Sequence, residues 1–94
     1  MVAWITVPRA AFEFVQGQPV LYASSPPVLR SFCGACGTAL TYANSQDLDF
    51  LDVTSCSLDD PQAFPPTHHS WIRDGMAWAA GADGLPKHQE SRPA

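Results

Sequence analysis

Short apolar runs separated by turn-forming residues are the main pattern along the chain. Alternating or β-branched positions predict extended strands, and each run stops at a proline, a glycine or a polar turn. The predicted strands cover residues 2–7, 12–15, 20–22, 28–32, 38–42 and 50–56. Residues 8–11 and 61–64 have room for one helical turn each. The pattern therefore predicts a mainly β protein with little helix.

The segment Cys33-Gly34-Ala35-Cys36-Gly37 joins two of these strands and carries two thiols at the tip of a predicted hairpin. Two cysteines separated by two residues can reach one metal ion when the turn between them is tight. Gly34 and Gly37 permit the positive φ that turns backbone N–H groups toward the sulfurs. The spacing favours a zinc knuckle with Cys33 and Cys36 as ligands. A structural zinc site has four protein ligands, so this pair would supply half of it.

Two other interpretations of the thiol pair stay open. A thioredoxin-type redox pair normally has its first cysteine at a helix N-terminus, where the dipole lowers the thiol pKa. Residues 37–42 are predicted to form a strand, which argues against a redox pair. The pair could also be two incidental thiols in a turn, but the double glycine spacing favours zinc over that interpretation.

The remaining zinc ligands are not evident from spacing. Cys56 follows Cys36 by 20 residues without a partner cysteine nearby, so it is predicted to be a small buried apolar residue. His68 and His69 are adjacent, and consecutive side chains of an extended segment point to opposite sides. At most one of the two histidines could therefore bind the same ion as Cys33 and Cys36.

Two groups of carboxylates are given structural roles. Asp59 and Asp60 precede Pro61, where they are predicted to cap a helical turn rather than to act in acid–base chemistry. A second group shares an alternating spacing but lacks the glycine and glutamate of a calcium loop. This group, predicted to be a solvated face, consists of Asp47, Asp49 and Asp52.

Length and charge narrow the classes of partner. The 94 residues predict a single domain, residues 1–94, with a frayed tail over residues 87–94. Nine acidic and five basic residues give a net charge of −4 without a basic cluster, which argues against nucleic acids and anionic membranes as partners.

We expect a cytoplasmic protein, since no leader or spanning stretch is evident. Only 15% of residues are charged, which hints at self-association, such as a homodimer, or at a missing neighbour.

Several separated motifs resemble one family in order and spacing. They are residues 2–8, 24–26, 30–38, 52–54, 57–61, 64–66, 69–71 and 83–86. Together they closely resemble the glutathione-dependent formaldehyde-activating enzymes, a family that includes centromere protein V. The resemblance implies small antiparallel β-sheets packed together with a zinc-knuckle hairpin. It also implies carbon–sulfur lyase activity on glutathione adducts of the S-hydroxymethylglutathione type, so zinc and glutathione are the expected cofactor and partner.

The chain departs from the family pattern at its start. Family members carry an upstream Cys-x-Cys that completes the structural zinc site, and a further cysteine region that holds a catalytic zinc. The resemblance therefore implies Cys33 and Cys36 as two of four structural ligands, and it matches no catalytic or glutathione-binding residue here. We expect the C-terminal portion of a lyase-family protein, inactive by itself. The alternative is a non-catalytic module in which two copies share one four-cysteine zinc site.

Overall fold

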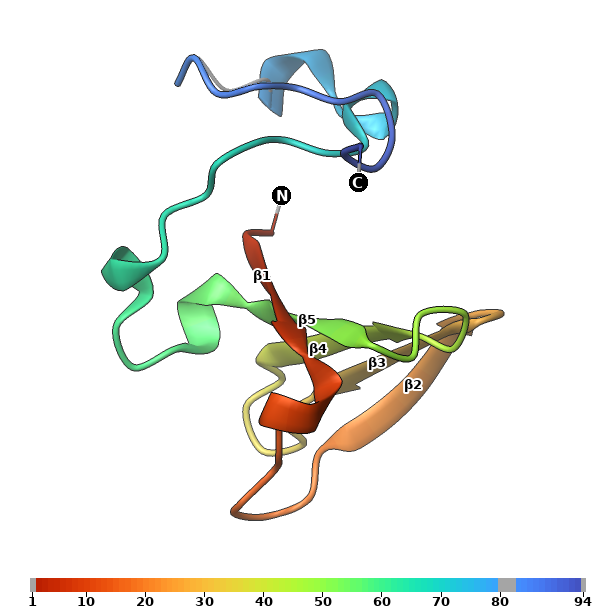
Figure 1. Cartoon of the computed structure of the whole chain (residues 1–94). Helices are drawn as coiled ribbons and strands as arrows, with labels where there is room; N and C mark the ends of the chain where they lie inside the picture. Colours follow the sequence, from red (N-terminus) through yellow and green to blue (C-terminus); the bar gives the residue numbers. More distant parts are fainter. Residues whose placement is uncertain (1, 80–82, 94) are drawn as a thin grey trace. The chain divides into compact units, whose positions relative to one another are not determined.

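The computed structural model describes residues 2–79 and 83–93, which divide into two compact units. The sheet unit is Val2–Phe64, and the C-terminal unit is Pro65–Ala94. The sheet unit contains one antiparallel sheet of five strands (Figure 1), namely β1 (Trp4–Pro8), β2 (Val20–Ser25), β3 (Val28–Phe32), β4 (Ala39–Asn44) and β5 (Phe50–Thr54). The prediction of a mainly β fold is confirmed.

The five strands join in the order β1-β5-β4-β3-β2, where the family resemblance led us to expect two packed sheets. Strands β2, β3 and β4 form a meander of consecutive hairpins. Strand β5 pairs with β1 along five residues but with β4 only at Thr41↔Val53 and Tyr42↔Asp52. A two-stranded ribbon therefore meets a three-stranded meander through a short junction, and the two become one sheet.

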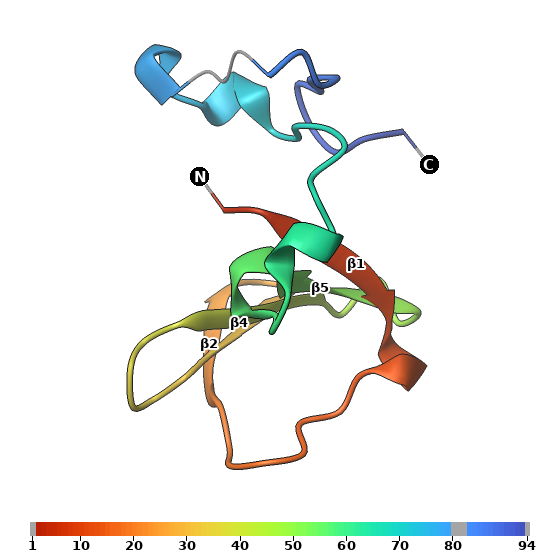
Figure 2. The ribbon, with the colours of Figure 1, turned by 90° about the vertical axis from the view of Figure 1, so that its left-hand side faces the viewer.

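The predicted strand at residues 12–15 is wrong. Those residues follow a 3₁₀ turn, η1 (Arg9–Ala11), and belong to an open loop that leads to β2 (Figure 2). Strands β1 and β2 lie at opposite edges of the sheet, so the chain between them must cross from one edge to the other. A crossing segment has no neighbouring strand to pair with, although its Phe12 and Phe14 rings still contact each other edge to face at 4.9 Å.

The region after β5 also differs from the prediction. The strand ends at Thr54 rather than at residue 56, because a 3₁₀ turn, η2 (Ser55–Ser57), follows at once. Strand β5 lies inside the sheet between β1 and β4. The single turn after Asp60 is present as η3 (Pro61–Ala63) with Pro61 at its start, but the Asp60 side chain makes no capping hydrogen bond.

The interior of the sheet unit is small and partly polar. Its buried residues are Val28, Ser31, Thr41, Val53, Thr54 and Ser55. The Ser31 and Thr41 hydroxyls, which face each other across β3 and β4, hydrogen-bond to one another. The Thr54 hydroxyl donates to the Ala39 carbonyl at 2.7 Å, so these buried hydroxyls have partners. Such pairing is needed because an unpaired buried hydroxyl would destabilise the fold.

The C-terminal unit is held by backbone bonds between residues 69–73 and 86–90. The His69 amide donates to the Pro86 carbonyl at 2.7 Å, and the His88 amide donates to the His69 carbonyl at 2.8 Å. Two 3₁₀ turns, η4 (Ile72–Asp74) and η5 (Ala77–Ala79), complete its described part. The fraying of residues 87–94 stays a prediction. Across residues 2–79 and 83–93, no helix has the length and apolar character that crossing a membrane requires.

Candidate functional site

The turn that carries the two cysteines is closed by backbone hydrogen bonds. The Cys33 amide donates to the Thr38 carbonyl at 2.8 Å, and the Gly37 amide donates to the Cys33 carbonyl at 2.7 Å. Gly37 has a φ of +79°, as predicted, which favours glycine at this position. Gly34 lacks the predicted positive φ. A Cβ at Gly34 would lie 2.9 Å from Cγ2 of Val20, so a larger residue there would require the Val20 side chain to move.

Both thiols are free, and they lie close enough to interact. Cys33 is half-buried and Cys36 is exposed. The sulfur of Cys36 lies 3.1 Å from the Thr38 hydroxyl. Hydrogen bonds from the Thr38 hydroxyl and backbone, and then from the Cys33 thiol, lower the pKa of Cys36. Because the thiolate is the form that binds zinc, the turn favours the ligand form of at least one of its cysteines.

Cys33 and Cys36 have no further metal ligands beside them in the described part of the chain. Across residues 2–79 and 83–93, no group of three or more His, Cys, Asp or Glu side chains is placed to hold a metal ion. Cys56 lies in η2 and is exposed, so its predicted burial is wrong. The strand predicted to bury it ends two residues earlier, at Thr54.

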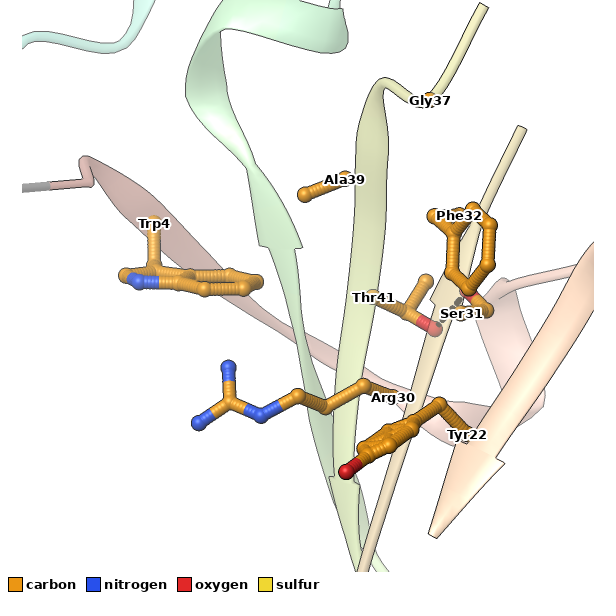
Figure 3. Close-up of a pocket in the computed structure, with 8 residues that line it drawn as sticks. All are labelled: Trp4, Tyr22, Arg30, Ser31, Phe32, Gly37, Ala39 and Thr41. Atoms are coloured by element: carbon orange, nitrogen blue, oxygen red, sulfur yellow. Dashed lines mark hydrogen bonds between the residues drawn. The ribbon is translucent and has the colours of Figure 1, made fainter. Parts of the chain in front are cut away.

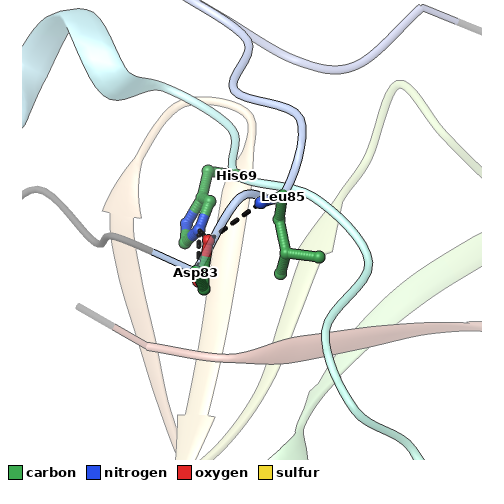
Figure 4. Close-up of polar contacts among 3 residues, drawn as sticks. All are labelled: His69, Asp83 and Leu85. Atoms are coloured by element: carbon green, nitrogen blue, oxygen red, sulfur yellow. Dashed lines mark hydrogen bonds and ion pairs between the residues drawn. The ribbon is translucent and has the colours of Figure 1, made fainter.

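The two adjacent histidines lie in the C-terminal unit and have local partners. Nε2 of His69 lies 2.9 Å and 3.1 Å from the two carboxylate oxygens of Asp83 (Figure 4). The Asp83 carboxylate also accepts a hydrogen bond from the Leu85 amide at 3.0 Å. This backbone bond, followed by the bond to His69, lowers the pKa of Asp83. Partial burial, with smaller effects from Arg92 and His88, lowers the pKa of His68, whose Nδ1 lies 3.0 Å from the Thr67 hydroxyl.

A pocket of about 330 Å³ opens on the sheet unit beside the thiol turn. Four strands and the turn contribute its lining residues, shown in Figure 3: Trp4, Tyr22, Arg30, Ser31, Phe32, Gly37, Ala39 and Thr41. Gly37 belongs to the turn itself, so the pocket and the thiols are neighbours along the chain and in space. Sequence reasoning gave the pocket no role because its lining comes from strands that are far apart in the sequence.

Arg30 is the charged residue among the described residues that line this pocket. Its guanidinium stacks over the Tyr42 ring, with Cζ 4.8 Å from the ring centroid, and its Nε donates to the Ser24 hydroxyl at 3.1 Å. Arg30 lies in one of the motifs that resemble the family, residues 30–38, but its function was not predicted from the sequence. The available signal was its spacing of two from Phe32, which places both side chains on one face of a strand.

A comparison with protein families indicates to which family the sheet unit, its thiols and its pocket belong. The family model of the glutathione-dependent formaldehyde-activating enzyme matches residues 1–74. The chain belongs to this family. The match includes the whole sheet unit, with both thiols and the pocket. No curated protein matches the chain. No solved structure matches it either.

Proposed function

We propose that this chain supplies Cys33 and Cys36 to a four-cysteine structural zinc site in a glutathione-dependent formaldehyde-activating protein. The observation that carries the proposal is the closed turn with two free thiols, one of them bonded to the Thr38 hydroxyl, in a chain of this family. Zinc held by cysteines would crosslink the hairpin tip to the segment that supplies the other two ligands. The whole protein would act as a carbon–sulfur lyase on glutathione adducts.

None of the residues in the printed chain is assigned to bond breaking. A zinc ion with an open coordination position supplies Lewis acidity that favours the thiolate form of a substrate sulfur. The family holds that ion with cysteines that have no counterpart at the positions matched here. The role of this chain would be to form the sheet, to hold the structural ion through Cys33 and Cys36, and to present the neighbouring pocket. We therefore expect these 94 residues alone to be inactive.

A shared site between two copies is the second candidate. Cys36 is exposed at the tip of the hairpin, so a second chain can approach its sulfur. Two copies related by a two-fold axis would bring four thiolates to one ion, which is the usual ligand number for structural zinc. This arrangement would be non-catalytic.

Cobalt(II) titration of the purified, reduced chain tests the proposal, because thiolate-bound cobalt absorbs light where free cobalt does not. We expect thiolate–cobalt absorption in the wild type, and an affinity weakened about tenfold or more in Cys33→Ser and in Cys36→Ser. Cys56→Ser is the matched control, since Cys56 is also exposed but lies outside the turn. Absence of the absorption from the wild type, or its survival in the Cys33→Ser/Cys36→Ser double variant, would overturn the proposal.

The same samples separate the two zinc arrangements. Native mass spectrometry reports how many metal ions and how many chains each species contains. A dimer with one ion for two chains supports the shared site, whereas a monomer with a weakly held ion supports ligands from another segment of the protein. One tightly held ion per monomer would contradict both arrangements, because it would require a full ligand set from one chain.

A further inference from the structure

The pocket beside the thiol turn combines aromatic walls with a single positive charge. Trp4, Tyr22 and Phe32 supply large apolar surfaces, and the Arg30 side chain extends toward the side where Trp4 lies (Figure 3). The Trp4 and Tyr42 rings meet edge to face at 6.1 Å, which fixes the wall next to the guanidinium. Ligand pockets typically combine a mostly apolar lining with a few placed polar groups. This pocket has that composition.

The guanidinium of Arg30 has N–H donors that the described part of the chain does not use. Its Nε is bonded to Ser24, but its two terminal nitrogens make no hydrogen bond or ion pair with any residue in the described ranges. Asp52, the register partner of Tyr42, accepts a hydrogen bond from the Thr6 hydroxyl at 2.7 Å instead. Stacking on Tyr42 holds the planar group in place without using its terminal donors. The terminal nitrogens are therefore free to bind an anion.

The other polar side chains of the pocket do not compete for that role. The Ser31 and Thr41 hydroxyls hydrogen-bond to each other. One planar cation with two free terminal nitrogens matches the two oxygens of a carboxylate. A polyphosphate or a nucleic acid would require several cations, and this chain carries five basic residues against nine acidic ones, without a cluster.

We propose that the Arg30 pocket binds a carboxylate of the glutathione part of the substrate. This inference rests on the proposed function, which supplies glutathione adducts as the ligand class. A volume of about 330 Å³ is at the low end for ligand pockets, so it would hold one carboxylate and its flanking residue rather than the whole tripeptide. The remainder of the ligand would extend past Gly37 along the thiol turn.

Isothermal titration calorimetry with S-methylglutathione, a stable adduct, tests this assignment on the purified chain. We expect Arg30→Gln to weaken binding about tenfold or more, because a charge-assisted bidentate contact is lost. Arg73→Gln is a matched control, since Arg73 also stacks on an aromatic ring, Trp71, at 5.2 Å but lies in the C-terminal unit. The control is expected to bind as the wild type does.

A change in the ligand tests the same contact without altering the protein. The diethyl ester of S-methylglutathione lacks both carboxylates, so its binding should be weaker in the wild type and insensitive to Arg30→Gln. Equal affinity of wild type and Arg30→Gln for S-methylglutathione, or no binding by the wild type, would overturn the pocket assignment. Cobalt binding at Cys33 and Cys36 is a separate readout: if it persists, the zinc proposal stands without the pocket, and if it is also absent, both fail.

Discussion

The sheet unit and the C-terminal unit are stabilised in different ways. The sheet unit has ladders of strand hydrogen bonds and a small buried interior that includes Val28, Val53 and paired hydroxyls. Among residues 65–79 and 83–93, none is buried. The C-terminal unit depends instead on backbone bonds between residues 69–73 and 86–90 and on the contact of His69 with Asp83. Packing therefore decides the stability of one unit, and exposed polar contacts decide that of the other.

This difference indicates which unit can hold the side chains of a functional site in fixed positions. Strand β3 carries Arg30 and leads directly into Cys33, so one regular element positions both the pocket and the thiol turn. Sites placed on strands are held more precisely than sites on loosely packed segments. The contact of His69 with Asp83 in the C-terminal unit lies at the surface instead.

Removing buried side-chain volume from the sheet unit should give the largest decrease in the free energy of unfolding. Val53 pairs with both Ile5 and Thr41 and is 8% exposed, so Val53→Ala should lower the free energy of unfolding by about 2 kcal/mol. Urea unfolding measures the change. Val15→Ala, at a position 87% exposed, is the control and should change the value by less than about 0.5 kcal/mol. Equal effects at both positions would show that the sheet unit lacks a packed interior.

Breaking the buried hydroxyl pair should give the next largest decrease in the free energy of unfolding. Ser31→Ala leaves the Thr41 hydroxyl without its partner and should cost about 1 kcal/mol of unfolding free energy, at the low end for an unpaired buried hydroxyl. The double variant Ser31→Ala/Thr41→Val removes both groups and should recover part of that loss. A double-mutant cycle by urea unfolding measures the coupling, and strictly additive losses would contradict the hydroxyl bond.

Strong acid should weaken the C-terminal unit through protonation of Asp83. The pKa of Asp83 is depressed by the Leu85 amide and by His69, so its contribution is fully present above the ordinary aspartate pKa of about 3.9 and is lost as pH falls through the folded value. Carboxyl ¹³C titration by NMR should place Asp83 below that ordinary value. His69→Asn should raise the titration midpoint of Asp83. A midpoint at or above the ordinary value would contradict the observed contacts.

The sequence was most informative where structure is determined locally. Strands β3 and β4 and the closed thiol turn were predicted because alternation and glycine spacing act over a few residues. The positive φ at Gly37 was predicted for the same reason. Residues 12–15 were wrongly predicted as a strand because pairing depends on which neighbour the fold supplies, and alternation alone does not contain that information.

The candidate site was predicted only in part, for the same physical reason. The pair at Cys33 and Cys36 is contiguous in sequence, so its spacing could be interpreted directly. The pocket forms only when β1, β2, β3 and β4 are assembled, and the role of Arg30 depends on Tyr42 and Trp4 being beside it. The spacing of Gly34 and Gly37 also gave no indication that the Val20 side chain lies close to Gly34.

Zinc K-edge X-ray absorption on the zinc-loaded protein tests the central claim most directly, because it reports the atoms bound to the metal. The account predicts a first shell of sulfur at about 2.3 Å that is diminished in the Cys33→Ser/Cys36→Ser variant. A first shell of nitrogen and oxygen at about 2.0 Å, unchanged in that variant, would contradict the claim that the hairpin thiols hold zinc.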